Sequence, residues 1–272
     1  IRDAQESRGL GDVYKRQYLN RIIDRKENGL IKVITGIRRC GKSFLLFNLF
    51  YDYLIESGVK EEQIITIALD DDTFVKYRDP DELSKYIRGK IVNSDMYYIL
   101  IDEVQKAPEL FEQIKIMCDE SDEKGLFWLT GSQQYKMMKK IRDTLAGRIG
   151  ILNLYSMSQR EKNNIVFDTA LDFSLETLQA RQKQVPKNDV EKVFYHIWEG
   201  GMPGHRSGRY TDRDVFYSSY IQSYIDRDVS TEIPGVDKVM FADFIRAAAC
   251  RSGQMLNLHD IAGDVGISDD TA

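Results

Sequence analysis

Apolar runs alternate with amphipathic stretches over the first half of the chain. Five short runs have the length and composition of buried strands, and they are residues 30–35, 63–69, 96–102, 126–132 and 148–154. The predicted helices between them are residues 42–58, 79–91 and 107–120. Strands that alternate with helices predict an α/β fold, in which helices cover both faces of a parallel sheet.

The pattern changes after residue 160. Residues 161–190 are polar and predict a linker with some helix. Residues 191–250 contain helical segments with no strand-like run between them. We therefore expect a sheet-containing domain over residues 18–160 and a helical domain over residues 191–250.

Residues 251–272 have the spacing of the beginning of a helix-turn-helix or winged-helix unit. The apolar face, the tight turn and the cap of the second helix are assigned to Ile261, Ala262, Val265, Gly266 and Ser268. An ordinary helical hairpin is the alternative. Because the sequence stops about one turn into the recognition helix, we expect a truncated unit that binds DNA weakly.

The first 17 residues show no sustained periodicity and no helix or strand signals. They are expected to be a non-native or disordered leader outside the fold. A genuine polar N-terminal arm is the alternative.

Composition narrows the class of protein. The net charge of −5 and the pI of about 5.4 give no global attraction to nucleic acid or to anionic membranes. Cys40, Cys118 and Cys250 are far apart, which favours a cytoplasmic protein without a disulfide framework or a zinc site. The longest apolar stretch, residues 44–55, is too short to cross a bilayer.

A phosphate-binding motif lies between the first predicted strand and the first predicted helix. Residues 36–43 read GIRRCGKS and fit the pattern G-x-x-x-x-G-K-[ST]. Backbone N–H groups of such a turn point at one anion, and the N-terminus of the following helix strengthens their field. Gly36 and Gly41 are expected to keep side chains out of the path of the phosphates.

Within this motif, Lys42 is expected to reach the β- and γ-phosphates, and the Ser43 hydroxyl to bind Mg²⁺. The sequence leaves open whether the two arginines contact phosphate, an interdomain carboxylate or solvent. The predicted nucleotide-binding residues are Gly36, Ile37, Arg38, Arg39, Cys40, Gly41, Lys42, Ser43 and Phe44.

Two carboxylates end the third predicted strand. Asp102 is placed where open α/β sheets bind ligands, and it is expected to hold Mg²⁺ together with Ser43. Glu103 is expected to orient and polarise the attacking water. This pair favours a hydrolase over a protein that only binds nucleotide.

Polar side chains follow the fourth strand, and an arginine precedes the fifth. Ser132 and Gln133 are candidates to contact the γ-phosphate or the water, although Ser132 alone also fits a plain helix cap. Arg148 is a candidate arginine finger for the nucleotide of a neighbouring subunit, with a surface or carboxylate-paired arginine as the alternative. Arg227 is a second candidate, and a salt-bridged surface turn is its alternative.

The ordered set of motifs resembles a large, mostly uncharacterised prokaryotic family of AAA-superfamily ATPases over residues 18–272. The segments that carry the resemblance are LIKVITGIRRCGKSFLL, YYILIDEVQKAPELFEQIKIM, LTGSQQ, LAGR and EGGMPG. The resemblance implies an ATP-binding core joined to a C-terminal domain of unknown function, with a winged-helix-like region after residues 223–230. It also implies longer relatives. Residues 155–158 read YSMS where the family usually has PLSF.

These observations lead to two hypotheses. The first is an Mg²⁺-dependent ATPase that couples its nucleotide state to movement of the C-terminal region, with further copies of the same chain in a homo-oligomer among its candidate partners. ATP is favoured over GTP because no [NT]KxD motif follows the fourth strand. The second hypothesis is a nucleotide-gated switch that binds DNA or protein with negligible turnover. A small-molecule kinase is less favoured, because Glu103 is a water-activating residue.

Overall fold

The computed structural model describes residues 15–92, 96–120, 126–132, 135–167, 171–206 and 210–272. The chain divides into two compact units, residues 1–211 and 212–272. Each unit is described by itself.

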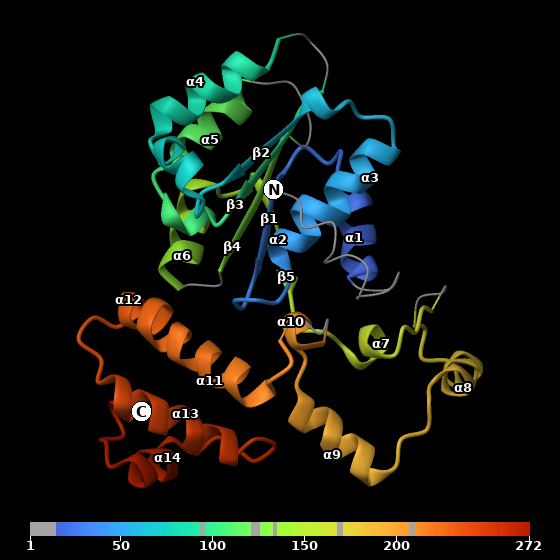
Figure 1. The fold of residues 1–272 in the computed structure, drawn as a ribbon, viewed down its shortest axis with the longest axis vertical. Helices are drawn as coiled ribbons and strands as arrows, with labels where there is room; N and C mark the ends of the chain where they lie inside the picture. The colour runs from blue at the N-terminus through green and yellow to red at the C-terminus, as the bar shows by residue number, and fades with distance from the viewer. Residues whose placement is uncertain (1–14, 93–95, 121–125, 133–134, 168–170, 207–209) are drawn as a thin grey trace. The chain divides into compact units, whose positions relative to one another are not determined.

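A five-stranded parallel sheet forms the centre of the first unit (Figure 1). Its strands, in spatial order, are β2 (Ile64–Ala68), β3 (Tyr98–Asp102), β4 (Phe127–Ser132), β1 (Ile31–Gly36) and β5 (Ile149–Leu154). Every pairing between neighbours is parallel. The predicted α/β fold class and the five predicted strands are confirmed, with strand ends displaced by one or two residues.

Helices cover both faces of this sheet (Figure 1). One face packs against α4 (Pro80–Lys90), α5 (Leu110–Asp119) and α6 (Tyr135–Thr144). The other face packs against α1 (Arg16–Ile23) and a helix built from α2 (Lys42–Phe44), a π-helical segment (Leu45–Phe50) and α3 (Tyr51–Glu56). Successive residues of β1 alternate between the two cores, since Val33 belongs to the first and Ile34 to the second.

Short helical segments complete the first unit. Short 3₁₀-helical segments cover Glu61–Gln63, Asp72–Arg78 and Val104–Lys106. The helices after the sheet are α7 (Gln159–Lys162), α8 (Leu175–Gln184), α9 (Val190–Glu199) and α10 (Pro203–Arg206). The glycine-rich segment between α9 and α10 has a structural contact, because the backbone N–H of Met157 donates to the carbonyl of Gly201 at 2.7 Å.

Residues 15–17, which the sequence assigns to a leader, are packed into the first unit. Helix α1 begins at Arg16, and the Lys15 side chain is fully buried. The Lys15 ammonium lies 3.5 Å from the Glu161 carboxylate and donates to the carbonyl of Tyr155 at 2.6 Å. Burial lowers the pKa of Lys15, and the Glu161 charge opposes that shift. The rest of the expected leader lies outside the described residues.

The second unit consists of helices joined by turns, with no strand in its described length. It contains α11 (Arg213–Tyr224), a π-helical segment (Ile225–Val229), α12 (Ser230–Glu232), α13 (Lys238–Cys250) and α14 (Leu258–Val265). Ile261 and Ala262 are buried, and α14 ends at Gly266 with φ 76°. Residues 267–272 form turns rather than a second helix. The helix-turn-helix unit therefore stays a prediction.

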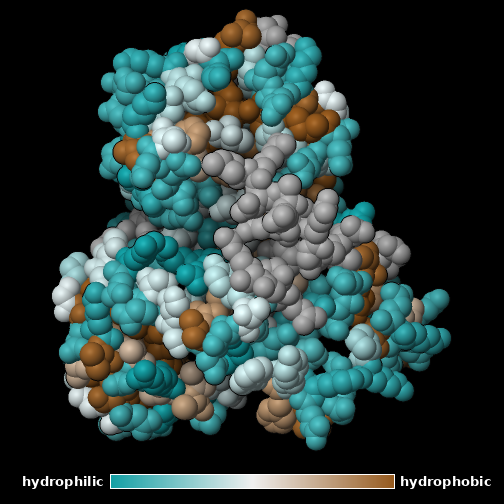
Figure 2. Space-filling model, viewed as in Figure 1, coloured by the Kyte–Doolittle hydropathy of each residue, from teal (hydrophilic) through white to brown (hydrophobic). Residues whose placement is uncertain are grey.

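The surface of the face shown in Figure 2 is mainly hydrophilic, and its hydrophobic side chains form small separate groups. Among the described residues, no helix combines the length and apolar character needed to cross a bilayer.

Candidate nucleotide-binding site

The phosphate-loop motif forms a tight turn between β1 and α2. Arg39 and Gly41 both have left-handed backbone conformations, with φ 59° and 97°. Glycine adopts this conformation at little cost, whereas for arginine it is uncommon. Strained backbone of this kind concentrates at ligand-binding segments. Ile37 is exposed in the loop, and Phe44 lies in the first helical turn.

Packing restricts position 36 to glycine, independently of any bound ligand. A Cβ atom at this position would lie 2.2 Å from the Leu154 carbonyl oxygen of β5 and 3.0 Å from the Cys40 sulfur. Cys40 is itself fully buried, and burial raises the pKa of its thiol. The sequence motif explains glycine at position 36 by the access that phosphates need. The structure adds a second reason, which is the close approach of the neighbouring strand β5.

Lys42 is held inside its own loop. Its ammonium donates hydrogen bonds to the carbonyls of Gly36 at 3.1 Å and Ile37 at 3.0 Å. The side chain is only 4% exposed. The charge therefore sits within the loop and not out in solvent.

Ser43 and Asp102 lie together, although they are far apart in sequence. Asp102 ends β3 and is buried, and burial raises the pKa of its carboxyl. Hydrogen bonds from the hydroxyls of Ser43 and Thr130 oppose that shift. The hydroxyl and carboxylate oxygens are the hard donors that Mg²⁺ prefers.

The described residues contain no cluster of three or more His, Cys, Asp or Glu side chains suited to a metal ion. Mg²⁺ commonly needs fewer protein ligands, because waters and substrate phosphates complete its shell. The Ser43 and Asp102 pair is consistent with that smaller requirement.

Glu103 adopts a left-handed conformation with φ 57° immediately after β3. Burial raises the pKa of its carboxyl, and the neighbouring Asp102 charge raises it further. The Lys42 and Arg38 charges and a hydrogen bond from the Gln105 amide act in the opposite direction. The Glu103 carboxylate thus lies within the electrostatic reach of the phosphate loop.

Gln105 and Thr130 link these groups, and neither is a predicted site residue. Besides the Glu103 carboxylate, Gln105 contacts Ser132, whose backbone N–H donates to the Gln105 side-chain oxygen at 3.3 Å. The Thr130 hydroxyl donates to Asp102 and accepts from the backbone N–H of Glu103 at 3.3 Å. The polar composition of the two strand ends is the only sequence signal for them.

Ser132 ends β4 directly beside Gly36 in the strand register. It is buried, and within the described part of the chain its hydroxyl has no hydrogen-bond partner. A buried hydroxyl left unpaired costs about 1–3 kcal/mol, which is why such groups are usually explained by function or by bound water. Gln133 lies outside the described residues.

The structure does not bring Arg148, one of the two predicted finger residues, to this site. Arg148 precedes β5, at the edge where the strands begin, and forms two hydrogen bonds with the Asp119 carboxylate at 2.8 and 3.2 Å. A six-residue strand separates that edge from the loop by about 20 Å. Arg227 lies in the second unit. Arg39 lies over the Tyr210 ring, 6.0 Å from its centroid.

The predicted residues that meet at the loop end of the sheet are Gly36, Arg38, Lys42, Ser43, Asp102, Glu103 and Ser132.

A family model described as an AAA domain matches residues 28–163, half of the chain, and the chain belongs to this family. Residues 190–272 match a domain of unknown function. Membership of the AAA family supports nucleotide binding by this chain.

Two curated relatives are themselves uncharacterized. The chain is 24% identical over 247 residues to a protein of Haemophilus influenzae, covering 90% of this chain and 57% of that protein. It is 28% identical over 122 residues to a protein of Methanocaldococcus jannaschii, covering 43% of this chain and 24% of that protein. The chain thus spans little more than half the length of the first relative.

Solved structures with distant similarity include a DNA replication initiation factor, with 12% identity over 97% of this chain and 86% of that chain, at a TM-score of 0.43. AMPPCP-bound DnaA from Aquifex aeolicus has 13% identity over 94% of this chain and 84% of its own, at a TM-score of 0.37. The Aeropyrum pernix ORC1 protein in complex with DNA has 13% identity over 93% and 82%, at 0.35. These similarities are too distant to bear on function.

Proposed function

We propose that this chain binds ATP with Mg²⁺ and hydrolyses it, in the cytoplasm. The observation that carries the proposal is the meeting of Ser43 with Asp102 beside the phosphate loop, with Glu103 adjacent. A protein that only holds a triphosphate has no need of a second carboxylate at that point. Here the second carboxylate lies close enough to Lys42 for their charges to interact.

Each side chain has a role that follows from its position. The loop N–H groups and Lys42 bind the phosphates, and Lys42 exchanges its bonds to the loop carbonyls for bonds to phosphate oxygens. Ser43 and Asp102 would hold Mg²⁺, which neutralises phosphate charge when bound. Glu103 accepts a proton from the attacking water, and the Ser132 hydroxyl, which has no hydrogen-bond partner among the described residues, orients that water or the γ-phosphate.

The test separates binding from bond cleavage. Glu103→Gln is expected to retain ATP binding while phosphate release falls by about 10²–10⁴-fold, the usual contribution of a positioned base. Lys42→Ala is expected to weaken binding itself, measured by titration with a fluorescent ATP analogue. Equal phosphate release by Glu103→Gln and the parent chain would remove Glu103 from the mechanism.

A nucleotide-gated switch is the second candidate, and the position of Arg148 favours it. With Arg148 about 20 Å along the sheet from the loop, this arginine does not serve as a finger for the nucleotide of its own subunit. In this version ATP changes the state of the C-terminal unit, which contacts DNA or protein through residues 251–272. Phosphate release that stays near zero at every protein concentration supports the switch, whereas release per subunit that rises with concentration supports a shared site in an oligomer.

A further inference from the structure

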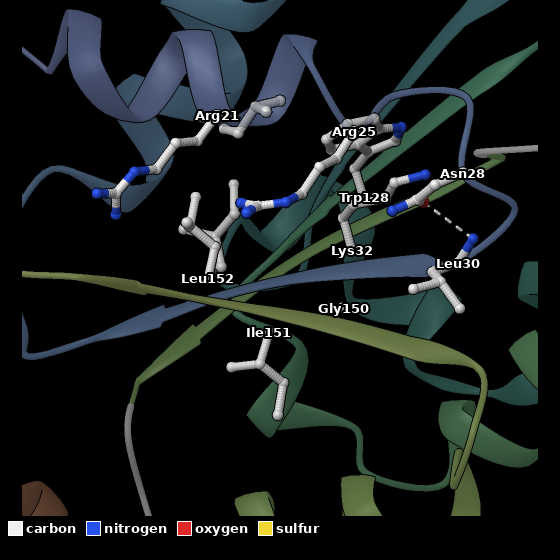
Figure 3. A pocket seen from close by; sticks show the side chains of 11 residues that line it. Arg21, Arg25, Asn28, Leu30, Lys32, Trp128, Gly150, Ile151 and Leu152 are labelled. Carbon is white, nitrogen blue, oxygen red and sulfur yellow. Dashed lines mark hydrogen bonds between the residues drawn. The ribbon is translucent and has the colours of Figure 1, made fainter. Parts of the chain in front are cut away.

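A second pocket lies in the first unit, on the sheet face that packs against α1 (Figure 3). Its volume is about 320 Å³, at the lower end of the range for ligand sites. Side chains from three neighbouring strands form the floor, because Lys32 of β1 is in register with Trp128 of β4 and Gly150 of β5. At Gly150 the floor carries no side chain.

Positive charge is concentrated in this pocket. Arg21 of α1 and Arg25, in the turn that follows this helix, lie at the rim, and Lys32 lies at the bottom. Figure 3 shows Arg25 extending from the end of α1 over the strands. Among the described residues that line the pocket there is no carboxylate, and Glu27 nearby pairs with Lys26 at 3.3 Å.

Lys32 is the unusual member of this set. Its side chain is 6% exposed, and its ammonium donates to the carbonyl of Lys26 at 3.0 Å and lies 4.9 Å from the Trp128 ring centroid. No carboxylate pairs with it in the described part of the chain. Burying a cation without a counter-ion is costly, so residues of this kind are normally paired. Burial accordingly lowers its pKa to about 8.

The remaining walls are apolar. They are formed by Ile22, Leu30, Ile34, Ile151 and Leu152. Small-molecule sites combine such walls with a few convergent polar groups that fix the orientation of the ligand. An anionic group would meet Lys32 and Arg25, while the rest of the ligand would contact the aliphatic side chains.

We propose that this pocket binds a small organic anion, a carboxylate or phosphate group on a compact apolar body. The site is distinct from the phosphate loop, since Lys32 precedes Gly36 by four residues of strand, about 13 Å. Its concave, apolar walls favour a small molecule over the backbone of a nucleic acid. The proposal does not depend on ATP hydrolysis, so it can fail or succeed independently.

The chain offers an internal reporter for the test. Of its two tryptophans, Trp128 lies under Lys32 and Trp198 lies in α9. In the Trp198→Phe variant, the indole N–H signal of Trp128 in a nitrogen-correlated NMR spectrum reports on the pocket alone. The probe is phenyl phosphate, compared with inorganic phosphate, which lacks the apolar body, and with phenol, which lacks the charge.

We expect saturable displacement of the Trp128 signal by phenyl phosphate and weaker binding of both comparison compounds. Lys32→Gln and Arg25→Gln should each weaken phenyl phosphate binding by about tenfold or more, the effect of losing one charge-assisted hydrogen bond. Lys32→Arg should retain binding. Arg88→Gln, which removes an arginine paired with Glu120 elsewhere on the surface, should change it by less than about twofold.

Several results would overturn the proposal. They are an absence of saturable binding, binding that is unchanged in Lys32→Gln and Arg25→Gln, and inorganic phosphate binding as tightly as phenyl phosphate. Displacement of phenyl phosphate by a DNA duplex at lower concentration would assign the pocket to nucleic acid instead. Arg25 is exposed, so Arg25→Gln keeps the test valid even where Lys32→Gln fails to fold.

Discussion

At the scale of single residues, Gly36 and Lys32 are two positions of one strand that are under different physical constraints. Both belong to β1. Gly36 is constrained by lack of space, whereas the buried Lys32 has no counter-ion among the described residues. Each constraint has a measurable consequence for stability. Measuring these changes in stability distinguishes a packing role of a residue from a ligand-binding role.

Gly36→Ala is expected to lower the free energy of unfolding by about 1–3 kcal/mol, because its Cβ atom would overlap the Leu154 carbonyl oxygen at 2.2 Å. Urea unfolding of both proteins measures the change. Gly89→Ala is the matched control, since no atom lies within 4 Å of its Cβ position in α4 and alanine should stabilise the helix by about 0.5–1 kcal/mol. Lost nucleotide binding at unchanged stability would instead assign Gly36 to the ligand alone.

Lys32→Met is expected to raise the free energy of unfolding at pH 7 by about 1–3 kcal/mol, because it removes a buried cation. Folding lowers the pKa of Lys32 from 10.5 to about 8, so the unfolded chain binds more protons between these values. The stability contributed by Lys32 therefore rises with pH across that window, and the advantage of methionine shrinks.

Urea unfolding of the parent and Lys32→Met proteins at pH 7 and at about pH 9.5 measures this difference, in which other titrating groups largely cancel. An advantage for methionine that stays constant between the two pH values would mean that Lys32 titrates normally in the folded chain.

At the scale of elements, the sequence was most informative where apolar runs end at glycine or at acidic residues. Four of the five strands were predicted on that basis, whereas the run over residues 148–154 is followed by Tyr155. Helix α1 begins at Arg16, inside the expected leader. The sequence did not predict this helix, because only two of its side chains, Tyr18 and Ile22, are buried, and two are too few for a periodic signal. The π-helical segment Leu45–Phe50 could not be predicted either, since its residues suit an α-helix equally well.

Part of the candidate site could also be predicted from the sequence, because the sheet topology determines where strand ends meet. The carboxyl ends of parallel strands meet at one edge of the sheet, so Asp102 and Ser132 were expected near the phosphate loop. Gln105 was not predicted, because its contacts depend on the left-handed turn at Glu103 and the 3₁₀ turn that follows. Local sequence gives no signal for that turn.

The attachment of α1 to α7 rests on a buried ion pair, and Glu161→Gln tests it. This change keeps an acceptor for the Ser158 cap of α7 but removes the carboxylate charge beside the Lys15 ammonium. We expect the free energy of unfolding to fall by about 3 kcal/mol. The double variant Lys15→Met/Glu161→Gln should recover most of that loss in urea unfolding. If neither variant changes stability, residues 15–17 contribute nothing to the fold.

At the scale of the whole molecule, the position of Arg148 means that catalysis with this arginine would require an oligomer. The arginine lies at the edge of the sheet where the strands begin and cannot reach the loop of its own subunit. Its side chain is 45% exposed beside Asp119, so a neighbouring subunit has access to it. If the proposed ATPase uses Arg148, the active form is an oligomer with each site shared between two chains.

Mixing two inactive variants tests this arrangement. Glu103→Gln keeps Arg148 but loses the base, and Arg148→Ala keeps the base but loses the finger. In a mixed oligomer, Arg148→Ala subunits receive the arginine of a Glu103→Gln neighbour. Phosphate release should therefore exceed the sum of the two variants measured alone, and removal of a finger should by itself cost about 10³-fold or more.

Arg88→Ala is the matched control for this experiment, because Arg88 pairs with Glu120, next to Asp119, in the same kind of exposed contact. It should release phosphate at the parental rate, since an exposed ion pair contributes little to stability. Parental turnover by Arg148→Ala alone would leave Arg148 as a surface arginine paired with Asp119. A mixture no more active than its components would exclude a shared site and favour the nucleotide-gated switch, in which ATP changes the state of the chain without rapid hydrolysis.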